Sequence, residues 1–153
     1  MEIHDRDRAG LQHAIEQAEV GRSEGGVPIG GALIADDGTV LAVGRNRRVQ
    51  QNSAIRHGET DALENAGRLP ASVYRRSTMY TTLSPCDMCT GAILLYGIPR
   101  VVMGENRTFV GGEDYLRSRG VEVINLDSEE CVALMDEFIA AHPEIWNEDI
   151  GED

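Results

Sequence analysis

The chain has 153 residues, of which 41% are hydrophobic and 26% charged, and these values are ordinary for one globular domain. It contains no run of 18 apolar residues, so we expect no segment that spans a membrane. The net charge of −12 argues against a nucleic-acid partner, because proteins that bind a polyanion usually present a basic face, and it favours a small uncharged substrate.

The predicted elements begin with an amphipathic helix over residues 5–23, in which apolar residues recur at spacings of three and four. Two apolar, β-branched runs follow at 29–35 and 39–43, and the turn residues between them predict a β-hairpin. Gly30 and Gly31 in the first run indicate a bulge, with a close approach of backbone or substrate as the alternative.

Helices and strands alternate in the rest of the chain, after a polar loop at 44–56. The predicted elements are a helix at 57–66, a strand at 78–83, a helix at 85–96, a strand at 100–103, a short helix at 113–119, a strand at 121–126, a helix at 127–141 and a short segment around Trp146. An antiparallel pair joined to parallel crossovers predicts an α/β fold, a three-layer α/β/α sandwich with a mixed five-stranded sheet.

Two short motifs contain the residues of a zinc site. His57-Gly58-Glu59 is followed by Cys86 and Cys89 in a Pro-Cys-Asp-Met-Cys run. One imidazole and two thiolates leave the fourth tetrahedral position of zinc open for water, as in catalytic sites. Bound zinc lowers the pKa of water to about 7, and Glu59, which is not needed as a ligand, can move the proton. The pattern H-x-E…P-C-x-x-C is the signature of zinc nucleobase deaminases.

Two other interpretations of the cysteines are open. Cys86 and Cys89 could form a redox dithiol, although His57 and Glu59 would then be unexplained. Alternatively, a fourth protein ligand could close the zinc site as a structural one, supplied by one of two residues: Cys131 or His142. We expect Cys131 instead to be a small, partly buried core residue in a helix that Asp127 and Glu130 open as a capping box. The histidines expected at the surface or at helix ends are His4, His13 and His142, and the methionines expected in the core are Met79, Met88 and Met103.

The cysteine count also bears on location. Three cysteines, two of them assigned to metal, provide no disulfide framework. Residues 1–6 lack the basic start and apolar core of a signal peptide. We therefore expect a cytoplasmic protein.

On these motifs the chain resembles the fungal-type cytosine deaminases, small members of the cytidine-deaminase-like superfamily. The shared segments lie at residues 24–31, 57–59, 63–65, 67–69, 80–92, 96–100, 104–106 and 148–152. The zinc motif is common to the superfamily, and the first and last segments narrow the resemblance to this family. Arg107, Thr108, the stretch 110–113 and Asn147 depart from the family pattern, close to the expected entrance of the site.

The resemblance implies a homodimer in which each subunit binds one zinc ion and hydrolyses free cytosine to uracil and ammonia. It implies that Asn46 and the backbone N–H of Gly58 hold the 2-oxo group. Glu59 would contact ring N3 and the amino group, and the Ser84 carbonyl and Asp149 would receive the exocyclic amine. Three residues would cover the ring: Phe109, Trp146 and Ile150.

Residue type alone leaves simpler roles open for several of these positions. Asn46 could be a turn residue after a strand, and Phe109 and Trp146 could be ordinary core aromatics. Asp149 lies in an acidic tail that would normally face solvent.

We expect Glu59 to act first as general base and then as general acid. A single zinc-dependent deaminase domain would span residues 1–153, with residues 143–153 as a C-terminal lid that buries Trp146, turns Asp149 inward and excludes nucleosides. The helical stretch 91–96 is apolar nearly all round, which predicts that a second subunit covers it.

Three rival functions share the metal motif. A tRNA adenosine deaminase would need a basic surface, which this acidic chain is not expected to have. A guanine or other free-base deaminase is the second, and a non-catalytic zinc-stabilised binding module is the third. A fourth protein ligand on the metal would favour the last.

Overall fold

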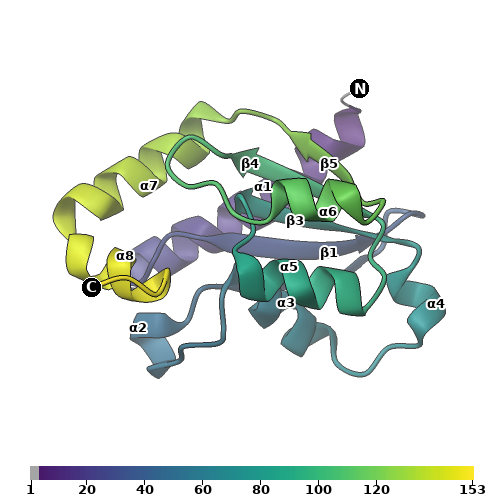
Figure 1. The fold of residues 1–153 in the computed structure, drawn as a ribbon, viewed down its shortest axis with the longest axis horizontal. Coiled ribbons are helices and arrows are strands. Elements are labelled where there is room, and N and C mark those ends of the chain that lie inside the picture. The colour runs from purple at the N-terminus through teal and green to yellow at the C-terminus, as the bar shows by residue number, and fades with distance from the viewer. Residues whose placement is uncertain (1–3) are drawn as a thin grey trace.

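A mixed five-stranded sheet forms the centre of the structure, a computed structural model that describes residues 4–153 (Figure 1). The strands are β1 (Gly30–Ala35), β2 (Val40–Arg45), β3 (Ser77–Leu83), β4 (Arg100–Glu105) and β5 (Glu122–Asn125). Their order is β2-β1-β3-β4-β5; β1 is antiparallel to β2 and β3, whereas β3, β4 and β5 are parallel. The predicted hairpin with parallel crossovers is confirmed. The expectation that residues 1–6 form no signal peptide falls partly on residues 1–3, which lie outside the described residues.

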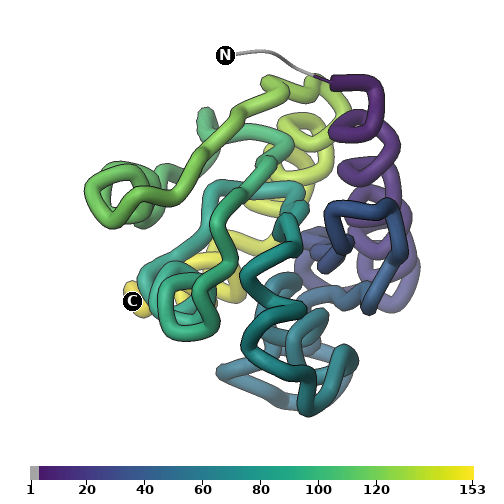
Figure 2. Tube along the Cα trace, turned by 90° about the vertical axis from the view of Figure 1, so that its right-hand side faces the viewer, coloured from purple at the N-terminus to yellow at the C-terminus, as the bar shows by residue number. Residues whose placement is uncertain are grey.

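Helices cover both faces of the sheet, so the three-layer prediction is confirmed (Figures 1 and 2). The helices are α1 (Asp5–Ser23), α2 (Arg48–Gln51), α3 (Gly58–Ala66), α4 (Ala71–Tyr74), α5 (Asp87–Leu95), α6 (Glu113–Ser118), α7 (Glu129–Ala141) and α8 (Pro143–Asp149). One face carries α1 and α7, and the other carries α3, α5 and α6. The one-turn helix α2 lies in the stretch 44–56, which is predicted as a loop, and α4 lies in a stretch for which the sequence predicts no element. No helix within residues 4–153 is long and apolar enough to cross a membrane.

Gly30 and Gly31 allow the backbones of neighbouring helices to approach β1 closely, and the bulge predicted there is wrong. The strand register shifts further along, between Leu33 and Ile34. A Cβ at Gly30 would stand 1.9 Å from a carbonyl oxygen of α1, and one at Gly31 would stand 2.6 Å from the carbonyl oxygen of Gly58. The missing side chains let α1 and the start of α3 touch β1 from its two faces. This contact places α3 against the sheet.

Three apolar clusters make up the core. Two flank the sheet, and the third lies at one end of it, where α8 packs on Leu83, Met135 and Phe138. Met79 and Met103 are fully buried as predicted, whereas Met88 is half-buried and belongs to none of the three clusters. The third cluster ties the C-terminal segment to the body of the protein.

The start of α7 differs from the prediction. Its N-cap is Ser128, whose hydroxyl accepts the N–H of Cys131 at 3.2 Å, so the capping box of Asp127 and Glu130 is wrong. Asp127 lies one residue earlier, in the left-handed region at φ 51°. Cys131, in the first turn of α7, is buried in the apolar cluster to which α1 and the sheet also contribute, so it is a core residue as predicted. His4 and His142 are exposed at helix ends as expected, and His13 is half-buried on α1.

A buried ion pair fastens α1 to the sheet. The Asp7 carboxylate is wholly buried and accepts two hydrogen bonds from Arg100 at 2.6 Å and one from the Tyr80 hydroxyl at 3.0 Å. Burial alone would raise the pKa of Asp7, but Arg100 and Tyr80 hold it below its usual value. The contribution of this carboxylate to stability is therefore complete above about pH 4 and is lost as the pH falls through the lowered pKa.

We expect Asp7→Asn to lower the free energy of unfolding by about 3 kcal/mol, because breaking a buried pair leaves the remaining charge poorly compensated. Denaturant titration at pH 7 measures the effect. Asp5→Asn, an exposed substitution in the same helical turn, is the matched control and should change stability little. A loss below 1 kcal/mol for Asp7→Asn would contradict this role.

Candidate active site

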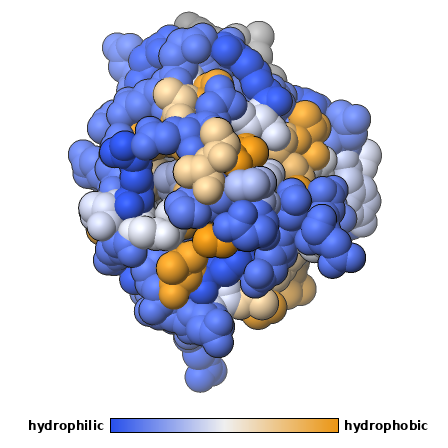
Figure 3. Space-filling view, turned by 90° about the vertical axis from the view of Figure 1, so that its left-hand side faces the viewer, coloured by the Kyte–Doolittle hydropathy of each residue, from blue (hydrophilic) through white to orange (hydrophobic). Residues whose placement is uncertain are grey.

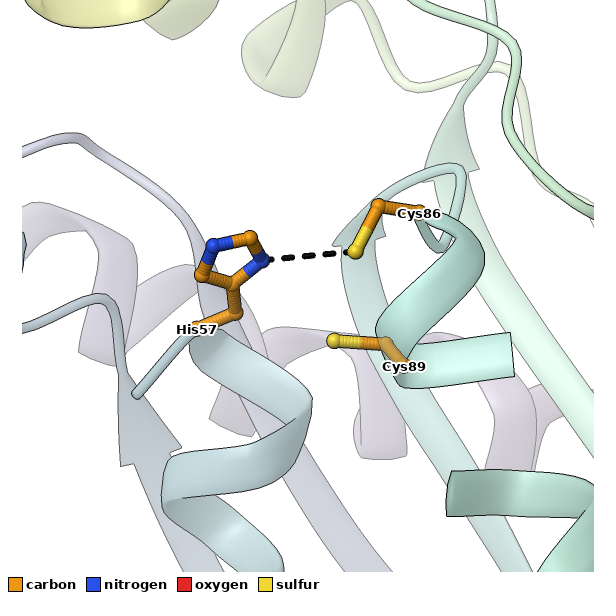
Figure 4. Close-up of side chains that lie close together, drawn as sticks. All are labelled: His57, Cys86 and Cys89. Carbon is orange, nitrogen blue, oxygen red and sulfur yellow. Dashed lines mark hydrogen bonds between the residues drawn. The ribbon is translucent and has the colours of Figure 1, made fainter. Parts of the chain in front are cut away.

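The three predicted metal ligands converge from the N-terminal ends of two helices (Figure 4). His57 is the N-cap of α3, Cys86 is the N-cap of α5, and Cys89 lies in the first turn of α5. Their ligand atoms all lie within 4.8 Å of one another, and His57 Nδ1 is 3.4 Å from Cys86 Sγ. A tetrahedral zinc ion with bonds of 2.0–2.3 Å holds its ligand atoms roughly 3.5–3.8 Å apart. A small adjustment would therefore close these side chains around the ion.

Neighbouring strands explain why the two motifs meet. The cysteines follow β3, and α3, which His57 precedes, packs on β1 and β2. Because β1 pairs with β3, the starts of α3 and α5 come together at one edge of the sheet. The Thr60 hydroxyl accepts the N–H of His57 at 2.8 Å, which fixes the first turn of α3.

The thiols have the electrostatic character of metal ligands. The Cys89 thiol lowers the pKa of Cys86 well below that of an ordinary cysteine; burial opposes this and His57 adds to it. The same contact and burial raise the pKa of Cys89. Zinc binds thiolates, so its binding would release the proton that the pair retains. This donor set of one imidazole and two thiols fits zinc.

No fourth protein ligand joins the cluster among the described residues. Within residues 4–153, no histidine, cysteine or carboxylate other than His57, Cys86 and Cys89 belongs to the candidate metal group. Cys131 lies in the apolar cluster beneath α1, and His142 is at the far end of α7. The closed structural zinc site is therefore wrong.

Glu59 is placed beside the ligands as a proton carrier. Its side chain is buried, and burial raises its pKa to about 7, helped by the negative charge of Cys86. A carboxyl group that titrates near neutral pH can both accept a proton and return it. Glu59 follows the N-cap His57 by two residues, so the start of α3 supplies both a ligand and the carboxyl group.

A small inner cavity adjoins the ligands. Its volume is about 20 Å³, room for roughly one water molecule. Besides Glu59, the predicted substrate-contact residues that line it are Ser84, Phe109, Trp146, Asp149 and Ile150. The rings of Phe109 and Trp146 meet edge to face, with centroids 5.8 Å apart and planes at 89°. Asn46 and Gly58 do not line the cavity but are adjacent to residues that do.

Asp149 faces inward and does not lie in a solvated tail. Asn46 donates to its Oδ2 at 3.0 Å, and Arg48 donates to its Oδ1 at 2.6 Å. The same Oδ1 lies 3.3 Å from His57 Nε2. Burial favours a raised pKa for Asp149, but His57 and Arg48 outweigh it and hold the pKa below its usual value. Asn46 is also a turn residue, because its Oδ1 accepts the N–H of Arg48.

The loop that carries Phe109 is held by two buried carboxylates that sequence reasoning missed. Glu105 accepts the backbone N–H groups of residues 107 and 108 at 2.8 and 3.0 Å. Glu113 accepts the Ser84 hydroxyl at 2.6 Å, and that hydroxyl accepts the N–H of Gly111 at 2.9 Å. In the sequence these acids look like surface residues, and nothing in their local pattern distinguishes them.

The fold and the site together are those of a zinc-binding deaminase: an α/β/α sandwich with one histidine, two cysteines and a buried glutamate at one edge of its sheet. Residues 4–105 match the cytidine and deoxycytidylate deaminase zinc-binding region. The chain belongs to this family. The match assigns Cys86 and Cys89 to metal, so the redox-dithiol interpretation is wrong.

Individual relatives differ in substrate. The chain is 60% identical over 146 residues to the cytosine deaminase of Candida albicans, over 95% of this chain and 97% of that protein. It is 36% identical over 108 residues to a tRNA-specific adenosine deaminase of Streptococcus pyogenes, over 69% of this chain and 67% of that protein. A solved structure from work on A-to-I editing by tRNA:A34 deaminases superposes with a TM-score of 0.69 at 25% identity, over 83% of this chain and 99% of that chain.

Proposed function

We propose that the protein is a zinc-dependent cytosine deaminase, which hydrolyses free cytosine to uracil and ammonia in pyrimidine salvage. The observation that carries the proposal is the buried Glu59 beside a three-ligand metal site with no fourth protein ligand in residues 4–153. The 60% identity to a cytosine deaminase over nearly the whole of both chains supports the choice of base.

His57, Cys86 and Cys89 would hold the zinc ion. When bound, the ion would lower the pKa of a water molecule so that hydroxide is available at neutral pH to attack C4. Glu59 accepts a proton from the attacking water and delivers it to ring N3. It then takes the proton of the new C4 hydroxyl and passes it to the amino group, so that the C4–N bond breaks, ammonia leaves and the 4-oxo group of uracil forms. One carboxyl group thus serves as base and as acid. Burial raises the pKa of Glu59 and so helps this carboxyl group to hold the proton between the two transfers.

The pocket residues would recognise the edge of the base. Asn46 and the Gly58 N–H hold the 2-oxo group, and Gly58 suits this role because its N–H, in the first turn of α3, has no partner within the helix. The Ser84 carbonyl and Asp149 receive the exocyclic amine. An ionised carboxylate has about four acceptor positions, so Asp149 can accept this bond besides those from Asn46 and Arg48. The ring would be covered by Phe109, Trp146 and Ile150.

Residues 143–153 act as the C-terminal lid of a single deaminase domain spanning residues 1–153. Trp146 is buried in the third apolar cluster, whereas the outer face around α7 and α8 is mostly hydrophilic, with small separate hydrophobic patches (Figure 3). Closure of the lid excludes bulk water and strengthens polar contacts to the base. A sugar attached to the ring would collide with the lid, so nucleosides and tRNA are excluded by shape.

The test is ammonia release from a panel of cytosine, 5-methylcytosine, guanine, adenine, creatinine, cytidine and tRNA. We expect turnover of cytosine and none of cytidine or tRNA. Faster deamination of guanine or of a tRNA anticodon arm would assign the protein to one of the rival activities.

We also propose a homodimer. Leu95 and Tyr96 at the end of α5 are 74% and 43% exposed in the single chain, as expected if a second subunit covers this helix. Light scattering at micromolar concentration should give twice the mass of the chain, and Leu95→Arg should shift it toward the monomer. A monomer mass for the parent protein would contradict the dimer.

A further inference from the structure

The contacts of Arg48 are unusual for an arginine on a one-turn surface helix. Its side chain is only 14% exposed, and it spans from α2 to the last turn of α8. Nε donates to Asp149 at 2.6 Å, and Nη1 donates to Glu148 at 2.8 Å. Asp149 is buried and Glu148 is 68% exposed, so one arm of the guanidinium points inward and the other outward.

The inner arm reaches the metal site through one carboxylate. Asp149 Oδ1 accepts from Arg48 and also lies 3.3 Å from His57 Nε2. That nitrogen is buried and makes no aligned hydrogen bond within the described residues, so the carboxylate is the charged group placed to orient it. The other ring nitrogen, Nδ1, points toward the cysteines (Figure 4). A histidine that binds a metal through one nitrogen generally donates from the other to such a carboxylate.

Arg48 also stands at the entrance. A second cavity of about 480 Å³, the outer cavity, borders the inner one, and both are lined by His57, Phe109 and Asp149. Arg48 lines only the outer cavity and not the inner one. Because the inner cavity holds about one water molecule, the wall between the two must move to admit a pyrimidine, and Arg48 donates to Asp149 in that wall.

We propose that Arg48 is a positioning residue that holds the Asp149 carboxylate against the zinc ligand His57 and so couples closure of the lid to retention of zinc. The inference rests on the zinc site of the proposed function, but it does not depend on which base is the substrate. Arg48 matches no part of the zinc motif. It is assigned by its contacts alone.

The test measures zinc affinity by competition with a chromophoric chelator. We expect Arg48→Met to weaken zinc binding by about 10–100-fold, the usual effect of removing the outer partner of a metal ligand. Asp149→Asn should do the same. The double variant should bind zinc no more weakly than the single variant with the larger loss, because Arg48 acts on His57 through Asp149. Arg48→Lys should recover part of the loss, since a lysine keeps the charge but cannot donate to Asp149 and Glu148 from one rigid fork.

Arg22→Met is the matched control. Arg22 also bridges two elements through an ion pair, to Glu137 at 2.8 Å, but it is 51% exposed and joins α1 to α7, neither of which carries a zinc ligand. It should leave zinc affinity within twofold of the parent. If Arg48→Met lowered the melting temperature yet kept the parent zinc affinity, Arg48 would have only a structural role and the inference would be overturned. Additive losses in the double variant would overturn it as well.

The two proposals fail separately. Absence of cytosine turnover in the zinc-loaded parent protein would refute the substrate assignment and leave the zinc affinities of the Arg48 and Asp149 variants unaffected. Unchanged affinities in those variants would refute the positioning role and leave cytosine turnover in the parent unaffected.

Discussion

Replacing Glu59 by glutamine should lower the kcat for cytosine by at least about 10²–10⁴-fold, the usual contribution of a general acid–base residue. The amide has nearly the same shape as the carboxyl group but cannot accept the proton from water or return it to the base. Steady-state ammonia release measures the effect, and metal analysis of the same sample reports the zinc content, which should be unchanged because Glu59 is not a ligand.

The matched control is Glu64→Gln, which changes the same residue type on the same helix at an exposed position and should leave kcat near that of the parent. Near-normal turnover by Glu59→Gln with zinc bound would refute the proton-transfer role. In that case another group would have to carry the proton, and the raised pKa of Glu59 would reflect burial alone.

Deleting residues 145–153 should abolish cytosine turnover while leaving the sheet and its flanking helices folded. The deletion removes Trp146, Asp149 and Ile150 from the wall of the inner cavity, so the site would fill with bulk water and lose its contacts to the base. Some stability is lost too, because Trp146 belongs to the third apolar cluster. Activity should therefore be assayed well below the melting temperature and with zinc in excess.

Circular dichroism and metal content establish that the truncated protein is folded and loaded, and deletion of residues 152–153, which are exposed, is the control. Turnover of cytosine at the full-length rate by the truncated protein would show that the lid is dispensable. The explanation for excluding nucleosides would then be wrong as well, so cytidine should be included in the same assay.

The chemistry of the site could be predicted from the sequence because it depends on residue types at short spacings. Zinc requires soft ligands, and His57, Cys86 and Cys89 lie within a few residues of a helix start or a proline that can be recognised locally. The extents of α1 and the alternation of strands and helices were also predicted, since apolar periodicity is a local property. The zinc ligands and the fold class were therefore determined by the sequence itself.

Contacts between distant segments were decided only by the tertiary structure. The glycines of β1 could not be recognised as contact points, because what each one touches lies in another element: Gly30 meets α1 and Gly31 meets Gly58. Arg48 lies 101 residues from Asp149, and Glu113 lies 29 from Ser84. A buried charge and a surface charge have the same letter in the sequence. Burial depends on how the whole chain packs. It decides which charged side chain becomes a partner of the metal site and which stays in water.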